Sequence, residues 1–232
     1  MPHRKITKAA LDWLPKRVLA RFGDQAAPLA AVYSLYPDRY AEMVRFGFVR
    51  KSAGPRSPEE IRAYCVRPDG QPIHSATGDR DMDMASLIYL FERILTSFSE
   101  NRPTEAAQYA GVLAHFIEDS LSPPHAGDVE AATHAAIERS VPEFTLTGRD
   151  PHSAPHNSLN NPGGNLLRTA EAILDRIYAA HEQNRQDLPA MIKAVADRDE
   201  PTLDTYRLRA GVNAAEILAD TLLAVGGTGI QP

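Results

Sequence analysis

The chain has 232 residues, of which 43% are hydrophobic and 24% are charged, a composition typical of a soluble globular protein. The 25 Lys and Arg residues and 30 Asp and Glu residues leave a net charge of -5, which argues against a generic nucleic-acid coat or a polybasic membrane anchor. The single cysteine, Cys65, excludes an internal disulfide and a thiolate-rich zinc site. Any metal ion must therefore bind to His, Asp and Glu.

The amino-terminal segment begins with basic residues, as a secretory signal does, but Asp12, Pro15 and Lys16 interrupt its apolar core. Apolar runs elsewhere, such as residues 88–92, are far shorter than the ~20 residues that span a bilayer. The sequence thus predicts a cytoplasmic protein, with secretion as the alternative if a signal has been removed.

Helical periodicity extends along most of the chain. In residues 84–95, for example, apolar side chains recur at spacings of three and four. Strand-like alternation is nowhere sustained, so the sequence predicts an all-α, single-domain bundle of several helices over residues 1–232. The predicted helices cover residues 4–22, 25–36, 80–99, 104–120, 128–140, 163–184 and 202–225.

Two long stretches, residues 48–80 and 141–164, are rich in residues that break helices. Long loops inside a helical domain are uncommon unless they are functional, so we expect lids or walls of a site there. The second stretch includes His152 and His156, which we expect in a solvated loop. At the end of the first stretch, the aspartates of Gly-Asp-Arg-Asp-Met-Asp indicate a helix start, because the Gly and distal Glu of an EF-hand are missing.

Residues 112–139 carry the most informative pattern. His115 and Asp119 are four apart in a helical segment, so both side chains project from one face, and the same holds for His134 and Glu138. A Ser-Pro-Pro sequence between the pairs ends the first helix and leaves His125 on a turn. Imidazole and carboxylate donors without a thiolate suit zinc in a catalytic setting.

An isolated His-x3-Asp pair on a helix is usually a surface pair of little energetic consequence. His115, however, lies in the apolar run Val-Leu-Ala-His-Phe-Ile, where a buried imidazole beside a carboxylate needs a partner. A core histidine satisfied by one hydrogen bond does not explain two such pairs and a histidine behind two prolines. The pattern therefore favours a metal site.

The order His-x3-Asp, then His, then His-x3-Glu resembles the zinc-dependent phospholipase C family and its relatives, the single-strand-specific zinc nucleases of fungi and plants. The text Pro-His-Ala-Gly-Asp after the first pair belongs to the same resemblance. Three residues outside the pattern also look like family ligands: His3 at the start of the first helix, Asp38 in Tyr-Pro-Asp, and His74 before the central helices. The resemblance covers residues 3–138.

The resemblance implies a cluster of about two to three zinc ions and a bundle of the phospholipase C type. It implies one zinc held by Asp38, His74, His115 and Asp119, a second held by His125, His134 and Glu138, and a third held by His3 with Asp119 as a bridge. It further implies that Asp38 serves both as a ligand and as the catalytic general base.

The chain departs from the family at its amino terminus. In the family, the third zinc also binds the amino and carbonyl groups of a processed amino-terminal Trp. The single Trp here is Trp13, downstream of His3, so Met1 or, after its removal, Pro2 is expected to supply the chain amine. The interval between His125 and His134 is also shorter than in the family.

Zinc lowers the pKa of a bound water to about 7, and paired ions hold attacking and leaving oxygens in line. The resemblance therefore implies hydrolysis of a phospholipid or another phosphate ester, with transient contact at a membrane surface. Two alternatives remain open. One is a nuclease, nucleotidase or phosphatase using the same cluster, which alone would make nucleic acid a partner. The other is a non-catalytic, zinc-stabilised helical binding module, in which protein ligands close every metal position.

Overall fold

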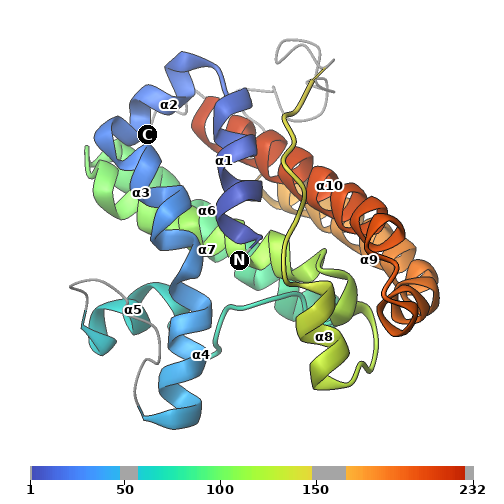
Figure 1. Ribbon diagram of the computed structural model, residues 1–232. Helices are drawn as coiled ribbons and strands as arrows, with labels where there is room; N and C mark the ends of the chain where they lie inside the picture. Colours follow the sequence, from blue (N-terminus) through green and yellow to red (C-terminus); the bar gives the residue numbers. More distant parts are fainter. Residues whose placement is uncertain (1, 48–56, 148–165, 228–232) are drawn as a thin grey trace.

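The computed structural model describes residues 2–47, 57–147 and 166–227 (Figure 1). These residues form α-helices joined by short 3₁₀ turns, which confirms the all-α prediction. No β-strand lies among them, and their one β-bridge is an isolated pair, Val66 with Pro72. Within these ranges no helix has the combination of length and apolar character that crossing a bilayer requires.

The helices fall into three parts of the chain. The first part holds α1 (His3–Trp13), α2 (Lys16–Phe22), α3 (Ala26–Ala31) and α4 (Tyr36–Phe46), with the 3₁₀ turns η1 (Gly23–Gln25) and η2 (Tyr33–Leu35). The middle part holds α5 (Pro58–Cys65), α6 (Arg80–Ser99), α7 (Pro103–Ser120), η3 (Pro123–Ala126) and α8 (Ala131–Ile137). The last part is a hairpin of two long helices, α9 (Leu166–Asp197) and α10 (Glu200–Gly227).

Prolines and capping residues explain two differences from the predicted helices. The helix predicted over residues 4–22 is broken into α1 and α2 because Pro15 removes a backbone donor and disfavours a helical residue before it. The segment 48–80, predicted to be irregular, contains α5. Ser57 caps that helix, since its hydroxyl accepts a hydrogen bond from the backbone N–H of Glu60 at 3.2 Å.

The middle helices agree better with the sequence. α6 covers residues 80–99 as predicted, and the side chain of Asp79 accepts hydrogen bonds from the first backbone N–H groups of the helix. This confirms that the aspartates mark a helix start. α7 begins at Pro103, one residue before its predicted start. α9 was predicted to end at residue 184 but continues to Asp197 and holds Pro189 in its interior.

Helix α7 is the centre of the molecule. Every residue from Ala106 to Ser120 is buried, because α7 packs against α1–α6, α9 and α10 (Figure 1). A helix that is apolar on all sides is stable only in such a surrounded position. Near its carboxyl end, however, the buried surface of α7 carries ionisable side chains. Other segments of the chain place further ionisable side chains against this surface.

The close packing of η2 on α7 depends on Gly111. A Cβ atom at Gly111 would lie 2.4 Å from Tyr33 Cβ and 2.5 Å from the Tyr33 carbonyl carbon, which is closer than real atoms approach. Only glycine therefore allows the backbone of η2 to reach α7 here. This contact sets the position of Ser34 and of the start of α4, which follows η2 directly.

Candidate metal centre

The central helix supplies the first imidazole and the first carboxylate of the candidate site. His115 and Asp119 lie one turn apart on α7, and His115 Nε2 is 3.2 Å from Asp119 Oδ2. His115 has no exposed surface and Asp119 is 3% exposed. A carboxylate in such a position is unfavourable unless neighbouring groups neutralise it, so the packing around Asp119 decides what the site can hold.

The backbone of η2 fixes the orientation of His115. Its Nδ1 atom lies 2.9 Å from the carbonyl oxygen of Ser34. A carbonyl only accepts hydrogen bonds, so Nδ1 carries a proton and Nε2 is the nitrogen that is left for a metal ion. That Nε2 atom is buried and has no hydrogen-bond partner among the described residues. An imidazole held by a backbone carbonyl, with its other nitrogen facing a carboxylate, is the arrangement of a metal-binding histidine.

Asp38 and His74 approach the same pair from two other segments. Asp38 lies in the first turn of α4, and its Oδ1 atom is 3.9 Å from His115 Nε2. His74 lies in the segment before α6, with Nδ1 3.0 Å from Asp119 Oδ2 and Nε2 3.8 Å from Asp38 Oδ1. Asp38 and Asp119 thus face both ring nitrogens of His74 and the Nε2 atom of His115.

The segment that carries His74 is held from two sides. The backbone N–H of Ala76 donates a hydrogen bond to Ser120 Oγ at 2.7 Å, which ties the segment to the end of α7. The buried carboxylate of Asp83 then accepts hydrogen bonds from Thr77, Gly78 and the hydroxyl of Tyr178. These contacts keep His74 next to α7 although it lies on a loop.

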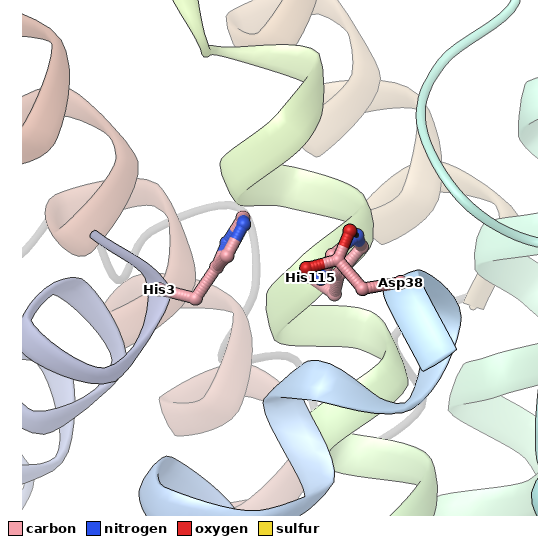
Figure 2. A group of neighbouring side chains, drawn as sticks. All are labelled: His3, Asp38 and His115. Atoms are coloured by element: carbon pink, nitrogen blue, oxygen red, sulfur yellow. Dashed lines mark ion pairs between the residues drawn. The ribbon is translucent and has the colours of Figure 1, made fainter. Parts of the chain in front are cut away.

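His3 reaches the site as the first residue of α1. Its Nδ1 atom is 2.8 Å from Glu118 Oε2 and its Nε2 atom is 3.4 Å from Asp119 Oδ1. The ring stacks on that of His115, with centroids 4.5 Å apart. Figure 2 shows His3 extending from α1 and Asp38 extending from α4 toward His115 on α7.

These five residues form one cluster, here called the central cluster: His3, Asp38, His74, His115 and Asp119. Ligand atoms of His3, Asp38 and His115 lie within 4.8 Å of one another, and so do those of His74, His115 and Asp119. His115 belongs to both groups, so the two groups share one space. Three imidazoles and two carboxylates, from four separate segments of the chain, can surround a divalent cation there.

A second group, here called the outer triad, consists of His125, His134 and Glu138. His125 Nε2 and His134 Nε2 lie 3.2 Å and 3.1 Å from the two oxygens of Glu138, and the ligand atoms lie within 4.8 Å of one another. The hydroxyl of Ser122 donates a hydrogen bond to Glu138 Oε1 at 2.7 Å. All three triad side chains are partly exposed, unlike His115 and Asp119. The structure therefore gathers the eight candidate residues into two groups, whereas the resemblance implies three zinc positions.

Mutual attraction shifts the pKa values of the central cluster. Burial lowers the pKa of His3, but its hydrogen bond to Glu118 and nearby negative charges outweigh burial and raise that pKa to about 9. For His74, the contact with Asp119 and the nearby negative charge of Asp38 outweigh burial in the same way and raise the pKa to about 10. Burial raises the pKa of Asp119, but His115 and His74 outweigh it and hold that pKa well below its usual range. The carboxylates of the central cluster therefore favour positively charged neighbours.

Metal-free protein should lose stability at alkaline pH. The raised pKa values of His3 and His74 contribute stability that is fully present below pH 6.5 and is lost as pH rises through about 9 and 10. We expect the free energy of unfolding to fall between pH 7 and pH 10 by on the order of 2 kcal/mol, with a smaller share from His74 because its side chain is 35% exposed. Urea titrations of chelator-treated protein measure this change.

Other groups also lose protons as the solution becomes alkaline, so the double variant His3→Gln/His74→Gln is the control for this experiment. It should show a shallower decline than the parent protein, because Gln has no proton to lose. Parallel declines in the two proteins would contradict the interpretation of these two histidines.

Several residues that support the ligands were not found from the sequence. Glu118 contacts His3, and Thr7 donates a hydrogen bond to Glu118. The carbonyl of Ser34 orients His115, and Ser122 contacts Glu138. One signal was present in the sequence: Glu118 directly precedes Asp119 in an otherwise apolar helix. The other supporting residues depend on contacts between distant segments. His152 and His156 lie outside the described residues.

The carbonyl of Pro2 is engaged within α1 and is not turned toward a metal ion. The carbonyl oxygen of Pro2 accepts hydrogen bonds from the backbone N–H groups of Lys5 and Ile6, at 2.9 Å and 3.1 Å. It is thereby committed to the first turn of α1. Trp13 is buried in the hydrophobic core, as expected for a residue that does not act as a ligand. Met1 lies outside the described residues, so the source of a chain amine stays a prediction.

Comparisons with protein-family models, with curated protein sequences and with solved structures found no match for this chain.

Proposed function

We propose that this protein is a zinc-dependent hydrolase of phosphate esters that cleaves a phosphodiester in the manner of a phospholipase C. The observation that carries the proposal is the buried Nε2 atom of His115, which has no hydrogen-bond partner among the described residues and faces Asp38 and Asp119. A lone pair that faces carboxylate oxygens is favourable when a cation lies between them.

The donor set fits zinc. Imidazole nitrogens and carboxylate oxygens are its usual ligands in catalytic sites, and no thiolate is needed. The central cluster has donors for more than one ion, and the outer triad supplies the three protein ligands typical of a catalytic zinc position. Two to three ions per chain, as the resemblance implies, would therefore divide between the two groups.

The charge of the site suits a phosphate ester despite the net charge of -5. With three zinc ions bound, the carboxylates of Asp38, Asp119 and Glu138 and the neighbouring Glu118 would leave a net charge of about +2. When bound, zinc supplies Lewis acidity toward phosphate oxygens and lowers the pKa of a water molecule. The protein residues must then hold the phosphate ester next to an acceptor for the proton of that water.

Asp38 is placed to be this acceptor. Its side chain is 30% exposed, whereas that of Asp119 is 4% exposed, so Asp38 is the central-cluster carboxylate that an incoming substrate reaches. Burial raises the pKa of Asp38, but electrostatic attraction to the imidazoles of His74, His115 and His3 outweighs it and lowers that pKa. Asp38 is therefore an ionised base at neutral pH and can take a proton on a carboxylate oxygen.

The test combines metal content with hydrolysis of three substrates: phosphatidylcholine, single-stranded DNA and a simple phosphate monoester. We expect about two to three zinc ions per chain and fastest release of the lipid head group, with both lost on treatment with a chelator. His115→Ala should lose zinc. His181→Ala is the matched control, since His181 contacts the carbonyl of Ser120 and lies in neither metal-binding group.

Each alternative has its own outcome in this experiment. Preferred cleavage of DNA would indicate a nuclease instead of a phospholipase. Preferred cleavage of the monoester would indicate a phosphatase. Bound zinc without hydrolysis of any of the three would favour the non-catalytic binding module. Native protein without zinc, or His115→Ala with unchanged zinc content, would refute the proposal itself.

A further inference from the structure

Glu118 carries a buried carboxylate that is not one of the eight candidate ligands and that has no role in the proposed site as described above. It follows Ile117 and precedes Asp119 on α7, and it is 2% exposed. Both of its oxygens are engaged: Oε2 lies 2.8 Å from His3 Nδ1, and Oε1 accepts a hydrogen bond from Thr7 Oγ1 at 2.6 Å. With both oxygens turned to α1, Glu118 is not a member of either group of candidate ligands.

The contact decides which nitrogen of His3 faces the cluster. With a cation bound at Nε2, the ring proton of His3 is on Nδ1, which then donates to Glu118 Oε2, 2.8 Å away. When a cation binds, Nε2 is the nitrogen with a free lone pair, and it lies 3.4 Å from Asp119 Oδ1 inside the central cluster. A carboxylate that receives the second N–H of a metal-binding imidazole fixes the ring and makes it a stronger donor.

His3 has few other means of being held. It is the first residue of α1, and within residues 2–47, 57–147 and 166–227 its ring makes no hydrogen bond besides the one to Glu118. The carbonyl oxygen of Pro2 accepts hydrogen bonds within the first turn of α1, so it does not help to orient the ring. The orientation of the His3 ring therefore depends on the Glu118 carboxylate.

We propose that Glu118 is a positioning residue, which orients His3 and thereby sets the affinity of the central cluster for the metal ion that His3 binds. This inference rests on the proposed zinc site. It assigns Glu118 no contact with metal or substrate, and it predicts that changes at Glu118 weaken one metal position while the outer triad keeps its ion.

The variant Glu118→Gln tests this directly, because it keeps the shape of the side chain and removes its charge. Zinc titrations against a competing chromophoric chelator should show one ion bound about 10- to 100-fold more weakly than in the parent protein. Thr7→Val, which removes only the hydrogen bond that steadies Glu118, should give a smaller loss at the same position. Glu105→Gln is the control, since Glu105 is also on α7 but pairs with Arg93 and Arg102.

A second measurement separates positioning from general destabilisation. In the zinc-loaded protein, the imidazole N–H proton of His3 should resonate far downfield because a carboxylate accepts it. Loss of the signal in His3→Ala identifies this proton. Glu118→Gln should move the signal upfield while the helical circular dichroism stays unchanged.

The outcomes are distinct. A parent protein without zinc would refute the proposed function and this inference together. Zinc binding that is equally tight in Glu118→Gln and the parent would overturn this inference alone, as would loss of every ion with helicity retained. If Glu118→Gln does not fold, Thr7→Val decides, and unchanged zinc affinity in that variant overturns the inference.

Discussion

Replacing Asp119 by Asn is expected to empty the central cluster of zinc and to slow phosphodiester hydrolysis at least about a thousandfold. Asp119 approaches three imidazoles, with oxygens 3.4, 3.0 and 3.2 Å from nitrogens of His3, His74 and His115. An amide carries no charge, and its NH₂ group would face nitrogens that must bind a cation. The loss of a few kcal/mol of transition-state stabilisation corresponds to this change in rate.

The measurement is zinc content by mass spectrometry, together with the initial rate of lipid head-group release. The outer triad lies on η3, on α8 and on the residue directly after α8, and it does not include Asp119, so about one zinc ion should remain per chain. Asp12→Asn is the control, because Asp12 is an exposed carboxylate on α1 that pairs with Lys8. Full zinc content and a rate within a factor of about three of the parent would refute the central role given to Asp119.

Gly111→Ala is expected to destabilise the protein by about 1–3 kcal/mol and to weaken zinc binding at the same time. In most helices, Gly to Ala is stabilising by about 1 kcal/mol, so the expected sign is opposite to that of helix propensity. The reason is the backbone of η2, which would lie 2.5 Å from the new Cβ at Tyr33 and 2.9 Å from it at Ser34. Backbone atoms cannot rotate away as a flexible side chain does.

The displacement would reach the metal centre along two routes. The carbonyl of Ser34 would move away from His115 Nδ1, and the start of α4, which carries Asp38, would move with η2. We therefore expect zinc affinity to fall by about 10- to 100-fold, as for other losses of a contact that orients a metal ligand.

Thermal unfolding and zinc titration of the same preparation measure both effects of Gly111→Ala. Gly227→Ala is the matched control, because its nearest contact would be an ordinary one, 3.6 Å from Leu223 Cδ1. Destabilisation with unchanged zinc affinity would show that the packing of η2 matters for the fold but not for His115. Stabilisation would contradict the close approach itself.

Local spacing was sufficient to predict much of this molecule. Residues four apart on a helix share a face whatever the rest of the chain does, so His115 with Asp119 and His134 with Glu138 were found as pairs before any fold was known. The length of α6 followed from its periodicity and from the aspartate that caps it. The family resemblance indicated His3, Asp38 and His74, and the structure places them beside the first of these pairs, His115 with Asp119.

The supporting contacts could not be predicted in this way. Glu118 and His3 are 115 residues apart in the sequence, and His115 and Ser34 are 81 residues apart. Such pairs have no fixed spacing, because they form where separate helices pack and the register of that packing depends on the whole core. The same holds for the glycine that admits η2, since a glycine inside a helix shows no sign in sequence of what lies against it.

Periodicity and spacing therefore established the helical class and two imidazole-carboxylate pairs, because both depend on geometry within a single helix. The tertiary structure alone decided which nitrogen of each buried histidine is free. A backbone carbonyl determines it for His115, and the carboxylate of Glu118 determines it for His3. Both groups come from segments that are far away in the chain.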